Sequence, residues 1–481
     1  MTPTSRFIVA AGFLAILAGM PPAIGSAESA PTNRTPPPNV LLIVIDDLNT
    51  DIGCMDGGGI TPHIDRLAQR GVLFDNAHCN APVCNPSRSS FLTGLLPPNL
   101  GVYENKAYFR DLPGHADRVT LPRHFRDHGY RAVGSGKIFH SGWQPKPSHP
   151  LAKHWDREAS WSDYAELPYG TPTPKPALNK WHRGEVKTYW GKSFWWGQTH
   201  AADEDCGDFQ NARFTADFLQ GEHDQPFFLA CGIFRPHLPF VAPRPYFKQY
   251  PLEDIEWPAG VKHNDLNDLP PFGKKYARRT GLNAAIRKEN RWKQAIQAYR
   301  ASTTFADAAV GQVLDALDSS PHRDNTLVVL ISDHGFHLGE KNHWTKFTFW
   351  DRSTRVPMIV AGPGIAPGRS PRTVSLVDLF PTLNEFCGLP ALEAHDGQSF
   401  ASLLANPEAE HPAVARVFHD AQNHQAVIDE DFRYIRYANG EEELYDRRAD
   451  PHDWHNLADD PGYAATLDRY RAQRFLPNGT R

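Results

Sequence analysis

The chain has 481 residues, of which 42 are proline and 36 are glycine, and its formal net charge at pH 7 is -5. This length allows two or three domains with a large apolar core, and the composition is that of a globular protein. A small negative net charge provides no global positive field, which argues against nucleic acid or an anionic membrane surface as a partner. Any anion must therefore be bound by a local group of side chains.

Residues 1–27 have the order of a secretory signal peptide. Arg6 stands in a short positive start, an apolar run follows from residue 7 to residue 20, and Gly25-Ser26-Ala27 offers a small-residue cleavage site. A membrane anchor is the alternative, but the run falls short of the roughly 20 apolar residues that span a bilayer. We therefore expect export to the periplasm or the medium, without stable insertion into the membrane.

The six cysteines, at positions 54, 79, 84, 206, 231 and 387, are too sparse for a disulfide scaffold. They are not paired at zinc-ligand spacing either. We expect no disulfide and no zinc ribbon.

Three apolar runs are typical of strands that are covered on both faces, and each is followed by polar residues. The runs are 40–45, 227–233 and 326–332. Between them, Thr61-Pro62 predicts a helix N-terminus, and apolar residues recur at helical spacing over 296–318. Strands that alternate with helices predict an α/β fold with a mostly parallel sheet sandwiched by helices. Ligands of such folds bind beyond the carboxyl ends of the strands, so the polar residues should converge there.

Two stretches depart from this alternation. Residues 141–210 form a predicted insertion that holds seven of the twelve tryptophans, which either pack as a buried loop or form a wall of a carbohydrate cleft. After residue 391 the chain contains an alternating run at 432–437, an Asn439-Gly440 turn and a final helical segment. We therefore predict a main domain over 28–390 and a small C-terminal domain over 391–481, built from an antiparallel sheet and a helix.

The sequence Cys84-Asn85-Pro86-Ser87-Arg88, followed by a short stretch and Thr93-Gly94, carries the strongest functional signal. A buried thiol before a turn is the structural alternative. The frame resembles the maturation signature of type I sulfatases, in which a maturation enzyme oxidises the cysteine to the aldehyde formylglycine. The resemblance implies that one hydroxyl of the hydrated aldehyde attacks a sulfate ester and that the other later expels the sulfate.

The residues after the predicted strands suit a site for an anion and a metal ion. Asp46, Asp47 and Asp333 are hard oxygen ligands that favour Ca²⁺ over zinc. Lys137 and His140 follow a short apolar strand and offer a cation and an imidazole, although such a pair is common in loops by chance. For two further candidates, His237 and Lys346, the residues alone also do not decide between a role in the site and a chance position in a loop.

The wider resemblance is to the branch of sulfatases that includes the iduronate 2-sulfatases, and it covers most of residues 39–457. It implies an alkaline phosphatase-like fold and a site made of residues that match the family position by position. The implied Ca²⁺ ligands are Asp46, Asp47, formylglycine 84, Asp333 and His334. The implied catalytic residues are Arg88 and Lys137, which stabilise formylglycine and the bound sulfate, His140, which assists sulfate release, His237, which protonates the leaving alcohol, and Lys346, which holds a sulfate oxygen.

The function expected from these residues is hydrolysis of sulfate esters on a carbohydrate, exo-acting and similar to a uronate 2-O-sulfatase. An algal polysaccharide such as ulvan, a fucan or a carrageenan is an alternative substrate. A phosphonate or phosphate monoester hydrolase is a second alternative, because that superfamily shares its metal site. The third is a non-catalytic carbohydrate-binding protein in which Cys84 stays unmodified.

Overall fold

The computed structural model describes residues 37–140, 156–168, 170–171, 183–187, 193–392, 394–420 and 424–473, with the backbone alone for 183–187 and 193. The predicted signal peptide, residues 1–27, lies outside the described residues. Within the described part of the chain, no helix combines the length and the apolar character that a membrane span requires.

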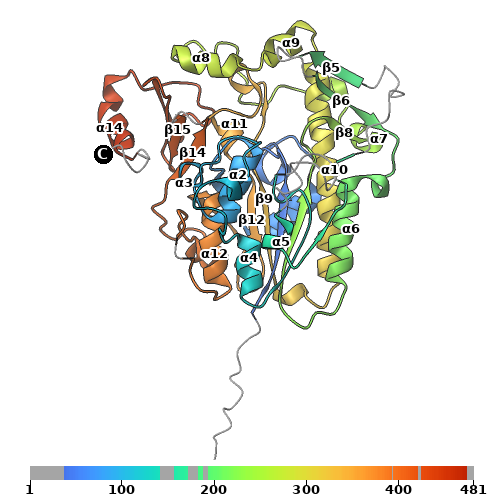
Figure 1. The fold of residues 1–481 in the computed structure, drawn as a ribbon. Coiled ribbons are helices and arrows are strands. Elements are labelled where there is room, and N and C mark those ends of the chain that lie inside the picture. Colours follow the sequence, from blue (N-terminus) through green and yellow to red (C-terminus); the bar gives the residue numbers. More distant parts are fainter. Residues whose placement is uncertain are drawn as a thin grey trace, which may run out of the picture. The chain divides into compact units, whose positions relative to one another are not determined.

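An eight-stranded sheet forms the centre of the fold (Figure 1). In spatial order its strands are β13 (Gly368–Ser375), β2 (Val72–His78), β12 (Met358–Ala361), β9 (Thr326–Ser332), β1 (Asn39–Ile45), β7 (Phe227–Ile233), β3 (Arg131–Gly136) and β4 (Asp163–Ala165). Only β12 pairs antiparallel with its two neighbours, so the other seven strands share one direction. The predicted mostly parallel sheet is confirmed.

Helices cover both faces of this sheet, because the central strand β1 is apolar from Val40 to Ile45 and all seven of its residues are buried. Alternate residues of β1 belong to two separate hydrophobic cores: Leu42 packs on one face and Ile43 on the other. The Leu42 face is covered by α2 (Cys84–Thr93), α4 (Leu121–Asp127), α12 (Leu379–Phe386) and α13 (Ala401–Ala405). The Ile43 face is covered by α1 (Pro62–Gln69), α6 (Gly207–Leu219) and α10 (Trp292–Asp318).

Two of the predicted helices differ in detail from the expectation. The helix predicted from residue 296 begins earlier, at Trp292. Thr61 precedes α1 but its side chain does not cap the helix; it donates to Asp65 instead, at 3.0 Å. The cap comes from α10, where the two carboxylate oxygens of Asp307 accept the main-chain N–H groups of His63 and Ile64, at 3.2 and 2.8 Å. A cap from a distant helix leaves no local sequence signal.

The predicted insertion contains regular structure where it is described. It supplies the edge strand β4, the short helix α5 (Arg157–Ser160), and the strands β5 (Arg183–Lys187) and β6 (Ser193–Thr199). These two strands form a small sheet with β8 (Phe240–Pro243), in the order β5, β6, β8. Trp161 and Trp196 are buried in hydrophobic cores, which favours the packing interpretation for these two. Four other tryptophans, at 143, 155, 181 and 190, lie outside the described residues.

A four-stranded antiparallel sheet follows near the C-terminus, and this prediction is also confirmed. Its strands run in sequence order: β14 (Ala415–His419), β15 (His424–Ile428), β16 (Phe432–Arg436) and β17 (Glu442–Asp446). Leu467 and Tyr470 of the last helix, α14 (Ala464–Ala472), pack on one face. Tyr276, from α8 (Pro271–Arg278), packs on the other. The predicted domain boundary near residue 391 stays a prediction.

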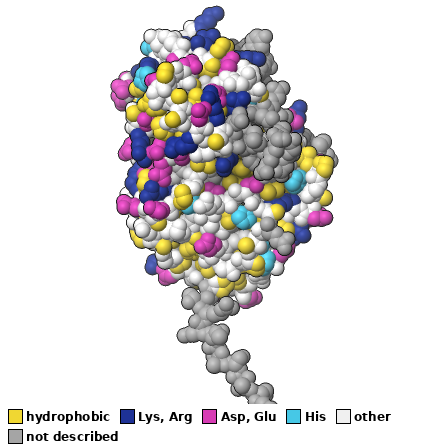
Figure 2. Space-filling model, turned by 90° about the vertical axis from the view of Figure 1, so that its left-hand side faces the viewer, with side chains coloured by type: hydrophobic (Ala, Val, Ile, Leu, Met, Phe, Trp, Pro, Cys, Tyr) yellow, Lys and Arg dark blue, Asp and Glu magenta, His cyan; other side chains and the backbone are white. Residues whose placement is uncertain are grey.

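The remaining short elements connect these layers. They are α3 (Pro97–Leu100), α7 (Arg244–Phe247), α9 (Leu282–Lys288), α11 (Asp351–Thr354) and the strand pair β10 (His337–Leu338) and β11 (Trp344–Thr345). On the face drawn in Figure 2, acidic and basic side chains are interspersed, in keeping with the small net charge of the chain.

Candidate active site and metal cluster

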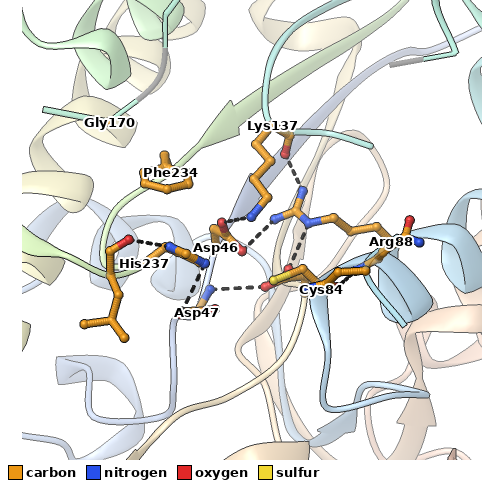
Figure 3. A network of polar contacts seen from close by, with 12 residues as sticks. Asp46, Asp47, Cys84, Arg88, Lys137, Gly170, Phe234 and His237 are labelled. Carbon is orange, nitrogen blue, oxygen red and sulfur yellow. Dashed lines mark hydrogen bonds and ion pairs between the residues drawn. The ribbon is translucent and has the colours of Figure 1, made fainter. Parts of the chain in front are cut away.

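Four neighbouring parallel strands, in the order β9, β1, β7 and β3, end at the same edge of the sheet. The residues that follow them therefore meet. Figure 3 shows side chains from three of these strand ends and from α2 pointing toward one another. The predicted site residues that the structure brings together are Asp46, Asp47, Cys84, Arg88, Lys137, His140, His237, Asp333, His334 and Lys346.

Cys84 is the first residue of α2, and its side chain is buried at the centre of this group. Its Sγ lies 3.1 Å from Lys346 Nζ and 3.3 Å from His334 Nε2, and it also hydrogen-bonds His140. Burial alone would raise the pKa of the thiol, but Lys137, Lys346 and His334 hold it well below its usual range. The start of a helix adds a favourable dipole for negative charge. The site thus stabilises an anion at position 84.

The His140 imidazole contacts Cys84 in its neutral form. Burial lowers the pKa of His140 to about 4, although the hydrogen bond to Cys84 opposes this shift. Its Nδ1 is buried without a hydrogen-bond partner among the described residues. At neutral pH this imidazole can accept a proton from a group at position 84.

Arg88 connects the carboxylates from two strand ends. Its Nε donates to Asp333 Oδ2 at 2.8 Å, and its Nη2 lies 3.3 Å from Asp46 Oδ1. Its Nη1 donates to the carbonyl oxygens of Lys137 and Ile138. Arg88 therefore holds the carboxylates and the start of the loop after β3. Among the described residues, its side chain donates hydrogen bonds to Asp333, Lys137 and Ile138 and not to the side chain of residue 84.

Asp46 forms an ion pair with Lys137. Burial opposes ionisation of the Asp46 carboxyl, but Lys137 and the other nearby cations hold its pKa well below the usual range. Lys137 reaches this position because β3 ends close to β7: a Cβ on Gly136, where φ is 72°, would lie 2.0 Å from the Gly232 carbonyl oxygen. Only glycine allows both this backbone conformation and this close approach.

Asp47 adopts a left-handed backbone conformation, with φ of 63°. The fully buried Tyr299 stabilises it from α10, because its hydroxyl donates to the Asp47 carbonyl at 2.8 Å and accepts the Asn49 N–H at 2.9 Å. The Asp47 side chain pairs with Lys346 at 2.6 Å. Its main-chain N–H donates to Asp333 Oδ1 at 3.1 Å. This conformation turns Asp47 into the site beside Asp46.

The acidic residues form a cluster that can hold a metal ion. Two overlapping sets of ligand atoms lie within 4.8 Å of one another, and both sets contain Asp46 and Cys84. Asp47 and His237 complete one set, and Asp333 and His334 complete the other. Asp46 Oδ1 and Asp47 Oδ2 are buried without hydrogen-bond partners among the described residues. Buried acceptors with free lone pairs are the atoms that a hard cation binds.

His334 is oriented for ligation by its main-chain neighbour. Its Nδ1–H donates to the Gly335 carbonyl at 3.0 Å, which leaves Nε2 facing Cys84 and the carboxylates. Against the opposing effect of burial, Asp333 raises the pKa of His334 to about 9. A second hydrogen bond of this kind commonly fixes the ring of a metal-binding histidine.

His237 lies at the open side of the site, where a quarter of its side chain is exposed. Its Nδ1–H donates to the Leu238 carbonyl at 2.6 Å, and its Nε2 lies 4.0 Å from Asp47 Oδ2. The ring of Phe234 stands beside it, with ring centroids 4.7 Å apart. Figure 3 shows Phe234 and Gly170 on this side of the group, away from Cys84.

The loop that carries His237 is held by two buried residues that the sequence did not single out as functional. Arg235 donates from Nη1 to the His237 carbonyl at 2.7 Å and from Nε to Thr171 Oγ1 and the Val241 carbonyl, both at 2.8 Å. Asp208, from α6, accepts the N–H groups of Phe234 and Arg235 at 2.7 and 3.1 Å. Asp208 stands inside an ordinary helical pattern, so nothing in the sequence indicates its contact with this loop.

Two family models match the chain. The model described as Sulfatase covers residues 38–389, and the one described as N-sulphoglucosamine sulphohydrolase, C-terminal, covers residues 339–474. A sulfatase of Formosa agariphila is 36% identical over 92% of this chain and 87% of its own length. The iduronate 2-sulfatase of Mus musculus is 32% identical over 73% of this chain and 69% of its own length.

Solved structures share the fold. A 2-O GAG sulfatase superposes with a TM-score of 0.68 at 25% identity and covers 91% of this chain and 90% of its own. The phosphonate monoester hydrolase of Silicibacter pomeroyi superposes with a TM-score of 0.72 at 24% identity, over 91% of this chain and 94% of its own, which shows a common fold alone. With a family match across most of its length, the chain belongs to the sulfatase family, hydrolases that act on sulfate esters.

Proposed function

We propose that this sulfatase uses formylglycine at position 84 and a Ca²⁺ ion to remove sulfate from an anionic carbohydrate. One observation carries the proposal. Cys84 begins a buried helix at the point where the acidic cluster meets Lys137, Lys346, His140 and His334. A structural thiol has no need of such surroundings, because buried cysteines generally pack as small apolar side chains.

The charges of the site support a bound cation and an anionic substrate. Without a metal ion, the three carboxylates of Asp46, Asp47 and Asp333 are balanced by Arg88, Lys137 and Lys346. A divalent ion held by Asp46, Asp47, Asp333, His334 and residue 84 would leave a net positive charge. That charge favours a sulfate ester monoanion. When bound, Ca²⁺ supplies Lewis-acid polarisation of a sulfate oxygen and favours ionisation of a neighbouring hydroxyl.

Formylglycine would supply the nucleophile: its hydrated aldehyde offers one hydroxyl to attack sulfur and a second whose deprotonation releases the sulfate and restores the aldehyde. The other side chains then have separate tasks. Lys346 and Lys137 bind sulfate oxygens and stabilise the charge that develops as the ester S–O bond breaks. His237, with Nε2 facing the site, gives a proton to the departing alcohol oxygen. His140, neutral and in contact with residue 84, accepts the proton from the second hydroxyl.

The proposed substrate is a sulfated oligosaccharide or polysaccharide, cleaved from one end at a uronate 2-O-sulfate. The iduronate 2-sulfatase of mouse and the 2-O GAG sulfatase support this choice. The sulfatase of Formosa agariphila carries no substrate in its name and is more similar to this chain. An algal polysaccharide therefore stays the alternative substrate.

The deciding experiment uses protein co-expressed with a formylglycine-generating maturation enzyme. Sulfate release is measured on an unsaturated heparan disaccharide whose only sulfate is on the uronate 2-hydroxyl, with Cys84→Ala as the blank. Release above the blank supports both the mechanism and the uronate assignment. Absence of release from this and from aryl sulfates, with formylglycine confirmed by peptide mass spectrometry, would contradict the proposed function.

A matched pair of aryl sulfate and aryl phosphonate monoesters separates the sulfatase from a phosphonate hydrolase. We expect a higher kcat/KM for the sulfate ester. A preference for the phosphonate would overturn the assignment.

We also propose that the protein is exported to the periplasm or the medium, because residues 1–27 have the arrangement of a secretory signal peptide. N-terminal sequencing of protein from fractionated host cells tests this directly. A mature chain that begins after residue 27 in an exported fraction is the expected result. A full-length chain confined to the cytoplasm would exclude it.

A further inference from the structure

The segment 271–288, which forms α8 and α9, has an unusual charge pattern. It contains six basic residues and no carboxylate, in a chain whose 55 acidic residues outnumber its 50 lysines and arginines. The basic residues are Lys274, Lys275, Arg278, Arg279, Arg287 and Lys288. A local excess of this kind produces a locally positive potential.

The two helices border a cavity of about 400 Å³. Its polar lining comes from Arg278, Arg287, His263, Asn283 and Asn342, and no carboxylate lines it. Within the described part of the chain, neither arginine forms an ion pair. The cavity is therefore built from donors and cations that lack an internal anion.

The guanidinium of Arg287 is held in place, but not all of its donor groups have a hydrogen-bond partner among the described residues. Its guanidinium stacks over the ring of Trp257, with 4.7 Å from Cζ to the centroid, and its Nε donates to Asn283 Oδ1 at 3.4 Å. Its Nη2 is buried and has no hydrogen-bond partner among the described residues. A buried donor without an acceptor is energetically unfavourable. An incoming oxygen anion would remove this deficit.

The cavity lies close to the active site. Asn342 lines the cavity and precedes Lys346 by four residues, which limits the distance between their Cα atoms to roughly 14 Å. Between them, the ring nitrogens of His343 lie 2.9 Å from the Ala277 carbonyl and 2.8 Å from the Lys346 carbonyl. Figure 1 shows α8 and α9 above α2, which begins with Cys84.

We propose that this cavity is a subsite for a second anionic group, a sulfate or a carboxylate, on a sugar further along the substrate chain. The proposal rests on the proposed function and deepens it. Guanidinium groups bind both kinds of anion through paired hydrogen bonds. Arg287, already immobilised on Trp257, loses little conformational freedom on binding, whereas Arg278, on the neighbouring helix, contacts the anion from the other side.

The first test measures binding and does not depend on turnover. The full-length protein is titrated with sucrose octasulfate in a calorimeter, with sucrose as the uncharged control ligand. The variants are Arg278→Glu and Arg287→Gln, and Arg323→Glu is the matched control. Arg323 is exposed and precedes β9, so it lies at the opposite edge of the sheet. We expect Kd to rise about tenfold for Arg278→Glu and not for Arg323→Glu. Equal Kd values for the three variants and the parent protein would overturn the proposal.

The second test measures specificity. The ratio of kcat/KM on a sulfated oligosaccharide to kcat/KM on an aryl sulfate should fall about tenfold in Arg278→Glu and Arg287→Gln. Oligosaccharides whose second sugar carries a sulfate, a carboxylate or neither distinguish the preferred anion. A ratio that is unchanged for all three excludes the subsite while leaving the sulfatase assignment intact. If the parent protein itself shows no activity on aryl sulfates, that result would instead contradict the proposed function.

Discussion

The guanidinium of Arg235 is bonded to the main chain of His237, with 2.7 Å between Nη1 and the carbonyl oxygen. Arg235 is itself 1% exposed, and burial lowers its pKa to about 10. The residue that we propose as the proton donor is thus held by a neighbour that does not reach the substrate. Arg235 is a positioning residue.

Arg235→Met should lower kcat on sugar sulfates by about one to two orders of magnitude, which is less than the roughly two to four orders typical for complete loss of a positioned general acid, because His237 itself remains. Arg235→Lys keeps the charge but not the forked geometry, and should recover only part of the rate. Circular dichroism and thermal unfolding of both variants control for misfolding. A merely structural role predicts equal losses on all esters, so equal losses would argue against positioning.

His237→Ala should lose far more activity on a sugar sulfate than on 4-nitrophenyl sulfate. The sugar alkoxide is a poor leaving group that needs a proton, whereas nitrophenolate departs without one. The check is a plot of log kcat/KM against the pKa of the leaving alcohol, which should be steeper for the variant than for the parent protein. Parallel plots would assign the proton to another group.

Removal of Ca²⁺ with a chelator should abolish activity and lower Tm, and readdition should restore both. An ion that binds only the folded chain stabilises it by about 2.7 kcal/mol at a hundredfold excess over Kd. Asp333→Asn should remove the response of Tm to Ca²⁺, because it alters a carboxylate of the cluster. Asp324→Asn, at an exposed position, is the control and should respond as the parent does. A Tm that is independent of Ca²⁺ in the parent protein would speak against the metal site.

Arg433→Met should destabilise the protein by about 3–5 kcal/mol, as expected when one partner of a buried charge network is removed. The fully buried Arg433 pairs with Asp351 at 2.8 Å and Asp453 at 3.0 Å, and both carboxylates would lose it. Arg436→Met, on the same strand but with a partly exposed side chain, should change the free energy of unfolding by less than about 1 kcal/mol. Urea unfolding monitored by fluorescence measures both, and similar values for the two variants would refute this account.

Asp307→Asn should destabilise the protein by about 1–2 kcal/mol at pH 5, because it removes one of two acceptor oxygens from the α1 cap. Burial raises the pKa of Asp307 to about 7. A raised carboxyl pKa contributes stability at low pH that is lost as the pH rises through 7. The difference between variant and parent should therefore shrink from pH 5 to pH 8. A constant difference across this range would mean that Asp307 does not titrate there.

The convergence of the candidate site residues could be predicted from the sequence where it depends on the ends of parallel strands. Asp46 and Asp333 both follow buried runs, and parallel strands deliver their carboxyl ends to one edge whatever their order. The order itself, with β1 between β9 and β7, was not predictable from apolar runs of similar composition. Nor was the role of Tyr299, which the helical pattern indicates only as a buried residue. Contacts between segments more than 200 residues apart depend on side-chain packing that no local pattern records.

Cys84 is 1% exposed, and all ten residues of α2 are buried beneath the rest of the fold. If Cys84 is converted to formylglycine as we propose, the modifying enzyme would have to reach the thiol before α2 packs against the sheet, because the folded chain buries it. Maturation would then compete with folding. The fraction of active molecules would depend on the rate of folding relative to that of modification, and a more slowly folding variant would be converted more completely.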